Sequence, residues 1–286
     1  MDTVGPAPVL SKGNLRYHVV RDGGLAYPPP MLFPGVESNE LTTLLGDSLT
    51  EEGLVFTPYS CGLIESGGAM VLLDAGMGPV ASELGAPAGR LLDALRERAI
   101  DPEDIDIVVI THAHLDHIGG LVANGSPLYS NARHLLARDE WDFWMTEECE
   151  RRIQGESAEP LIGTARGLLP VLREAGLLEL IDGETDVVTG VTVIPAPGHT
   201  PGHMAVVVSD GEDSVRYLAD VFLHELNLLH PDWVSAVDVD ADLTVTTRVG
   251  LFDQAAADGS VITAFHVGRS GRIAKQGEAY GYIGSS

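Results

Sequence analysis

The sequence predicts an α/β fold in which two sheets pack face to face and helices cover their outer sides. Short β-prone runs occur in both halves of the chain, and helical stretches lie between them. The 286 residues are 44% hydrophobic, which is enough apolar material for one large core. The chain contains no repeat, no low-complexity tract and no convincing linker, so we expect residues 1–286 to form a single domain.

The first 55 residues differ from the rest of the chain in being rich in turn-forming residues. They include the triple proline Pro28 to Pro30 and the pair Pro34-Gly35, with few periodic segments between them. We therefore expect residues 1–55 to form an arm or lid over the core.

Beyond this arm, hydrophobic periodicity predicts the helices and strands in turn. In the first half it predicts a hairpin interrupted by Glu-Ser-Gly-Gly, then a helix, then a buried strand that ends at Thr111: residues 59–64 with 70–73, 88–100 and 105–110. In the second half it predicts a helix, four short strands, a helix and a last strand: residues 165–175, then 177–181, 191–194, 204–209 and 215–218, then 242–257 and 261–264.

The charge balance limits the partners that the protein can bind. There are 42 acidic and 17 basic residues, which give a formal net charge of -25. Because phosphate groups are bound mainly by lysine and arginine, we expect neither nucleic acid nor an anionic membrane surface as a partner. The same charge disfavours strongly anionic substrates, so we expect a small neutral molecule.

Cysteine content and hydropathy indicate a cytoplasmic protein. The two cysteines, Cys61 and Cys149, are far apart and form no CxxC pair, which excludes a disulfide framework. The first residues lack a basic segment followed by an apolar run, and no stretch approaches the ~18 uninterrupted apolar residues of a membrane span.

The most informative segment is Thr111-His-Ala-His-Leu-Asp-His-Ile-Gly-Gly120, which places four potential metal ligands within six positions directly after a strand. Side chains two apart in an extended segment project the same way, so His112 and His114 can chelate one ion. Asp116 and His117 follow where the chain turns and can face a second ion a few ångströms away. The spacing therefore predicts two metals.

Three further ligands are expected at the ends of later strands. His199 lies in the glycine- and proline-rich loop Ala196-Pro-Gly-His-Thr-Pro-Gly-His203, whose backbone is stiff enough to orient its ring. Asp220 follows the strand at 215–218, and His266 follows the strand at 261–264. Four separate strand ends thus each offer a hard or borderline ligand.

These residues resemble the metallo-β-lactamase superfamily, whose fold holds metal ligands on loops at strand ends. The resemblance covers about residues 54–270 and implies a four-layer αββα sandwich of two mixed sheets packed face to face. It also implies a structural role for Asp74, because Leu72-Leu-Asp-Ala-Gly76 is similar to the family's strand ending in Asp-Thr-Gly. By this resemblance the first metal site is His112, His114 and His199, the second is Asp116, His117 and His266, and the bridging carboxylate is Asp220.

Within the superfamily, the segments ITHAHLDHIGG, GHTPGH and LADVFLHELNLLHPDW resemble most the branch that contains methyl parathion hydrolase and bacterial quorum-quenching lactonases. Members of that branch have an N-terminal arm that contributes to dimer contacts and to the substrate pocket, so the resemblance allows a homodimer. One position departs from the pattern. Acyl-homoserine lactonases of this fold carry a tyrosine three residues after the bridging aspartate, whereas this chain has Leu223.

The predicted function is a dinuclear metal-dependent hydrolase that acts on a small ester-like substrate, namely a lactone, an aryl ester or a phosphotriester. The nucleophile would be a hydroxide between two ions, because paired Lewis acids lower the pKa of water from ~16 to about 7. Asp116 is expected to accept or relay a proton. Zinc suits the ligands best, although manganese, iron or cobalt can occupy the same geometry.

Two other functions use the same ligands. A mononuclear iron dioxygenase would leave the second site without a purpose, and a non-catalytic metal-binding regulatory module would not need the intact set of seven ligands. For the substrate pocket, we expect contacts from Phe33 in the arm and from Phe222 and His224 beside the bridging aspartate.

Overall fold

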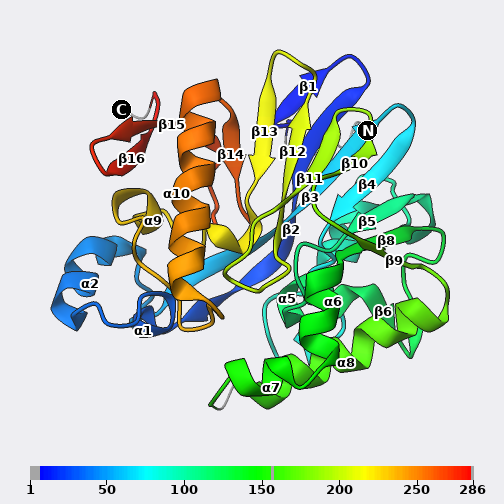
Figure 1. The fold of residues 1–286 in the computed structure, drawn as a ribbon, viewed down its shortest axis with the longest axis horizontal. Coiled ribbons are helices and arrows are strands. Elements are labelled where there is room, and N and C mark those ends of the chain that lie inside the picture. Colours follow the sequence, from blue (N-terminus) through cyan, green and yellow to red (C-terminus); the bar gives the residue numbers. More distant parts are fainter. Residues whose placement is uncertain (1–6, 156–157, 285–286) are drawn as a thin grey trace.

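A computed structural model describes residues 7–155 and 158–284 and contains two mixed sheets, each of seven strands, that pack face to face (Figure 1). The predicted αββα sandwich is confirmed. The first sheet has antiparallel strands at one end and parallel strands at the other. In spatial order it consists of β1 (Leu10–Lys12), β2 (Leu15–Tyr27), β3 (Val55–Ser66), β4 (Ala69–Leu73), β5 (Ile107–Val109), β8 (Arg133–Ala137) and β9 (Leu178–Ile181).

The second sheet is antiparallel except for one parallel pair, β13 and β14. Its strands follow the order of the chain: β10 (Thr185–Val188), β11 (Val191–Pro195), β12 (Met204–Ser209), β13 (Ser214–Tyr217), β14 (Val261–Thr263), β15 (Gly271–Gln276) and β16 (Ala279–Tyr282). A separate small hairpin joins β6 (Val122–Ala123) and β7 (Ser126–Pro127).

Helices cover the outer sides of both sheets, as Figure 1 shows with α10 over the second sheet and α6 to α8 beside the first. The α-helices are α1 (Pro29–Leu32), α2 (Ser38–Leu45), α3 (Val80–Glu83), α4 (Leu91–Arg96), α5 (Leu115–Ile118), α6 (Arg138–Met145), α7 (Glu148–Arg152), α8 (Ala158–Glu174), α9 (Leu226–Leu229) and α10 (Ala241–Asp258). Single 3-10 turns occur at Gly46–Ser48, Pro102–Asp104, Gly119–Leu121 and Ala219–Val221. None of the helices in the described ranges is long and apolar enough to cross a membrane.

The main hydrophobic core lies between the two sheets. It includes Val71 and Val109 of the first sheet together with Val206 and Val215 of the second, all fully buried. A second cluster fills the space between the second sheet and α10. The β-branched side chains that made these strands recognisable in the sequence are therefore the ones that hold the sheets together.

The N-terminal segment differs from the expected arm. Residues 10–27 belong to the first sheet, where β2 pairs with β3 along most of its length. A register shift between Arg21 and Gly23 lets the strand continue through its glycine pair, which is why turn-forming residues concealed a strand. Residues 28–54, which contain α1 and α2, lie outside the sheets, and they pack through their own cluster against Leu226.

Candidate metal centre

The seven predicted ligands meet at one edge of the sandwich because four strands end there. The segment 112–117 follows β5 and bends into the short helix α5, and His199 lies in the loop between β11 and β12. Because β13 and β14 are parallel, the residues that follow them, Asp220 and His266, reach the same edge. All seven residues are buried or nearly so.

The loop that carries His199 depends on a close backbone approach. Gly198 has a φ of 136°, and a Cβ at this position would lie 2.4 Å from the backbone nitrogen of Thr244 at the start of α10. Only glycine fits there, so the expected role of this loop in orienting His199 has a steric basis.

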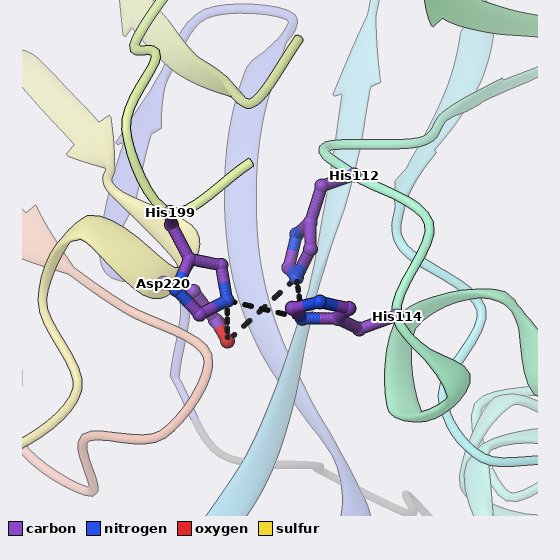
Figure 2. A group of neighbouring side chains, drawn as sticks. All are labelled: His112, His114, His199 and Asp220. Atoms are coloured by element: carbon purple, nitrogen blue, oxygen red, sulfur yellow. Dashed lines mark hydrogen bonds and ion pairs between the residues drawn. The ribbon is translucent and has the colours of Figure 1, made fainter. Parts of the chain in front are cut away.

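His112, His114, His199 and Asp220 form a first group whose ligand atoms all lie within 4.8 Å of one another (Figure 2). Nδ1 of His114 is 3.0 Å from Nε2 of His112 and 3.1 Å from Nε2 of His199. Three ring nitrogens that face one another cannot all be satisfied by hydrogen bonds among themselves. Two ligands of a tetrahedral zinc ion lie about 3.4 Å apart, so this spacing fits a shared metal ion.

Asp116, His117 and His266 form a second group of the same dimensions. Oδ2 of Asp116 is 3.3 Å from Nε2 of His266 and 3.9 Å from Nε2 of His117. The two groups meet at Asp220: its Oδ2 is 3.3 Å from Nε2 of His199 and 3.2 Å from Nε2 of His266, and its Oδ1 is 3.2 Å from Nε2 of His117. One carboxylate therefore reaches both groups.

The hydrogen bonding of the described residues supports a metal at this centre. Nε2 of His117 and Oδ1 of Asp220 are fully buried and lie 3.2 Å apart without the geometry of a hydrogen bond, and neither has a hydrogen-bond partner elsewhere in the described ranges. Leaving such atoms buried and unsatisfied costs about 1–3 kcal/mol each. Divalent cations accept this combination of imidazole nitrogens and carboxylate oxygens, so the donor set fits the metal that the sequence predicted.

Two of the histidines are oriented by carboxylates behind their rings. Nδ1 of His199 donates to Asp238 at 2.7 Å, and Nδ1 of His117 donates to Asp74 at 2.9 Å. Both bonds leave the Nε2 lone pair directed at the centre. Asp74 also accepts hydrogen bonds from the backbone and the hydroxyl of Thr111, so it ties the end of β4 to the ligand loop.

Glu140 connects the two ligand loops from α6. Its Oε1 accepts from the backbone N–H of Ala113 at 2.8 Å, and its Oε2 accepts from the Thr200 hydroxyl at 2.6 Å and the backbone N–H of Gly202 at 3.1 Å. The indole N–H of Trp144 donates to Oε1 as well. A single buried carboxylate therefore fixes the loop of His112 and His114 relative to the loop of His199.

The electrostatics of the centre divide the histidines into two kinds. Burial lowers the pKa of His112 well below its ordinary value and that of His114 to about 3, so both rings are neutral donors. Burial also opposes charge on His199 and His266, but Asp220 and the neighbouring aspartates outweigh it and raise the pKa of each to about 9. For Asp220, burial is likewise outweighed, here by His266 and His117, and the pKa lies well below its usual range.

A cavity of about 280 Å³ opens above the centre. Its polar end is formed by His114, Asp116, Asp220 and His266, and its walls are mostly leucine, methionine and valine. None of the described residues that line it is lysine or arginine. Four residues that carry a hydroxyl group also line it: Tyr27, Thr57, Tyr59 and Ser235.

The structure brings none of the three residues expected to contact substrate into this cavity. Phe33 is fully buried against Trp233 and His224, and Phe222 is fully buried against Phe252 beneath α10. Hydrophobic packing takes both side chains into the satellite cores of the N-terminal segment and of the second sheet. His224 lines a separate surface groove, and it is Leu223 that lines the cavity.

Several residues that build the centre carry no signal in the sequence that marks them. Asp238 and Glu140 lie 39 and 60 residues from the partners that they hold, His199 and Thr200, and no local motif marks either of them. Tyr27 was missed because it stands in the segment predicted to be an arm, and Tyr59 because nothing in its predicted strand marks it as facing a cavity. A β-branched and aromatic run such as Leu15–Tyr27 was the one signal that could have identified Tyr27 as part of a strand.

Comparison with known proteins agrees with this fold. AidC, a dizinc quorum-quenching lactonase solved with a product, superposes with a TM-score of 0.88 at 24% identity, covering 97% of this chain and 96% of that one. The hydrolase AbOPH of the beta lactamase superfamily superposes with a TM-score of 0.86 at 23% identity, covering 98% of each chain. At these identities the likeness concerns the fold.

Sequence relatives include the N-acyl homoserine lactonase of Bacillus cereus, which is 27% identical over 181 residues, and that of a Bacillus sp, which is 25% identical. Each alignment covers 57% of this chain and 63% of the relative, less than two thirds of its length. Residues 54–263, well over half of the chain, match the sequence pattern of the metallo-beta-lactamase superfamily. The protein belongs to the metallo-beta-lactamase superfamily.

Proposed function

We propose that this protein is a metal-dependent hydrolase with a dinuclear zinc centre that hydrolyses a small neutral ester-like substrate of the lactone type. The observation that carries the proposal is the contact of one carboxylate, Asp220, with both groups of ligands at the polar end of an apolar cavity. A mononuclear site would need only one of the groups.

In this proposal the seven ligands are shared between two ions. His112, His114 and His199 would hold one ion, Asp116, His117 and His266 would hold the other, and Asp220 would contact both. When bound, such ions supply Lewis acidity, which activates water near neutral pH and polarises the oxygen of an ester. Asp116 lines the cavity and can hold a proton beside the substrate.

The cavity favours a neutral substrate with an apolar part. Its walls would bury an alkyl or aryl group, and the lack of lysine or arginine among the described lining residues gives an anionic substrate no partner there. The relatives named as N-acyl homoserine lactonases support a lactone over a phosphotriester.

The proposal is tested by purifying the protein without chelator, measuring metal per chain, and assaying γ-decalactone, 4-nitrophenyl butyrate, a phosphotriester and a β-lactam. We expect about two divalent ions per chain and a preference for the lactone that disappears on chelation. One iron per chain, with oxygen consumption on a sulfur substrate, would instead indicate a mononuclear dioxygenase. Bound metal without turnover of any substrate would indicate a regulatory module.

Asp220→Ala is the sharpest single change. We expect at least a hundredfold loss of activity and the loss of one or both ions, because the shared ligand is removed. Asp47→Ala, at an exposed aspartate of the N-terminal segment, is the matched control and should keep both metal and activity. Circular dichroism checks that both variants are folded, and full activity in Asp220→Ala would refute the shared ligand.

A further inference from the structure

Two tyrosines in the cavity share a hydrogen bond that leaves one proton over. The hydroxyls of Tyr27 and Tyr59 are bonded to each other, and both side chains line the cavity above the ligands. The two residues come from the neighbouring strands β2 and β3, which pair antiparallel. In the register of these strands Tyr27 lies opposite Val55 and Tyr59 lies opposite Gly23, so it is the length of the two side chains, and not direct cross-strand pairing, that brings the hydroxyls together.

A count of protons shows what the pair can do. Two phenols carry two protons, and the bond between them uses one. Neither oxygen has any other hydrogen-bond partner in the parts of the chain that the structure describes. The second proton is therefore available to a molecule in the cavity.

The other two hydroxyls that line the cavity are not available in this way. The Thr57 hydroxyl donates to the carbonyl oxygen of Leu25, and the Ser235 hydroxyl donates to the carbonyl oxygen of Met31. Leu223, which also lines the cavity, offers only methyl groups. Among the described lining residues, the tyrosine pair thus supplies the one neutral hydroxyl donor that is not already committed.

Tyr59 is the member that lies closer to the ligands. Its ring stacks on Phe265 at a centroid distance of 5.2 Å and meets the edge of His266 at 5.3 Å. The side chain is 1% exposed, so these contacts hold the ring in one orientation. Tyr27 is partly exposed and less constrained, which suits the partner that donates to Tyr59.

We propose that Tyr59, oriented by a hydrogen bond from Tyr27, donates a hydrogen bond to an oxygen of the ester bound at the centre. This inference rests on the proposed hydrolase function. A fixed donor aimed at an oxygen that gains negative charge stabilises the transition state more than the ground state. Tyr59 is thus a substrate-contacting residue, and Tyr27 is a positioning residue that acts through it.

The test compares Tyr59→Phe and Tyr27→Phe with Tyr129→Phe. The control removes a buried hydroxyl that has no hydrogen-bond partner among the described residues and does not line the cavity. With γ-decalactone as substrate, we expect kcat to fall about ten- to a hundredfold in Tyr59→Phe, with KM changed less, and about three- to tenfold in Tyr27→Phe. Metal per chain should equal that of the wild type in all three variants.

Binding of the product gives a readout that does not depend on turnover. By calorimetry, 4-hydroxydecanoate should bind about fivefold more weakly to Tyr59→Phe than to the wild type and equally well to Tyr129→Phe. If Tyr59→Phe matches the control in kcat and in product affinity while the wild type is active and chelator-sensitive, this inference is overturned and the hydrolase proposal stands. A metal-loaded wild type that hydrolyses no ester would overturn both.

Discussion

Two of the five predicted ligand rings, those of His199 and His117, depend on an aspartate that does not itself reach the centre. Asp238 accepts from Nδ1 of His199, and its other oxygen accepts from the backbone N–H of Ser235 at 2.7 Å. Asp74 holds His117 in the same way from a backbone φ of 62°, a left-handed conformation that aspartate tolerates better than most residues. The orientation and basicity of the His199 and His117 rings are therefore set by residues outside the predicted ligand set.

The role of Asp238 predicts a loss of metal affinity rather than of the fold. In Asp238→Asn the amide oxygen can still accept from His199, but the negative charge that makes the ring more basic is gone. We expect metal to bind about ten- to a hundredfold more weakly, as measured by competition with a chromophoric chelator.

The control for this change is Asp242→Asn, at an aspartate four positions further along that is exposed at the start of α10. It should leave the metal affinity unchanged. Equal affinities in the two variants would show that the carboxylate of Asp238 contributes nothing to the centre.

At the scale of elements, α6 connects the two ligand loops through hydrogen bonds to Glu140. Glu140 receives four hydrogen bonds, two on each carboxylate oxygen. Gly202 lies so close to α6 that a Cβ there would be 2.1 Å from the backbone nitrogen of Glu140. The helix and the loop of His199 are thus held together by packing as well as by hydrogen bonds.

Glu140→Gln should destabilise the folded protein, because an amide nitrogen cannot accept the two hydrogen bonds that one carboxylate oxygen of Glu140 now accepts. Each donor left without a partner costs about 1–3 kcal/mol, so we expect the free energy of unfolding to fall by about 2–4 kcal/mol. Urea denaturation measures the change, with Glu147→Gln as the exposed control. A midpoint equal to that of the control would mean that Glu140 does not hold the loops.

The elements show where reading the sequence succeeds and where it stops. The hairpin of β3 and β4, the strands from β11 to β14 and the helix α10 lie within a few residues of their predicted positions, because their apolar residues repeat with the period of the element. β2 was missed because the N-terminal segment is rich in turn-forming residues, and the strand passes its Gly23-Gly24 pair beside a bulge instead of turning there. A one-dimensional pattern does not distinguish the two.

The same limit applies to side chains near the site. His112 and His114 can be recognised in the sequence because two histidines two positions apart in an extended segment project to the same side, as two ligands of one metal ion must. Phe222 and Leu223 are neighbours, and which of them faces the cavity is decided by the packing of Phe222 on Phe252, a residue of α10. That contact joins residues 30 positions apart, so a local sequence pattern cannot predict it.

At the scale of the whole molecule, protons and metal compete for one set of rings. In the metal-free protein the pKa of His199 and of His266 is raised to about 9, and that of His117 lies well above its ordinary value, in each case because aspartates outweigh the effect of burial. At pH 7 these three rings are charged, and a metal ion must displace a proton from each.

This competition fixes the sign of two pH dependences. Folded-state pKa values above the unfolded value of about 6.5 stabilise the metal-free protein fully below pH 6.5, and this stabilisation is lost as the pH rises through about 9. Metal affinity changes in the opposite direction, since proton loss frees the ligands. We therefore expect the Tm of chelator-treated protein to fall between pH 6.5 and 9 while the affinity for zinc rises.

Calorimetric titration with zinc at pH 7, in buffers of different ionisation enthalpy, should show proton release from His117, His199 and His266. A titration that releases no protons would contradict the charged state assigned to these rings.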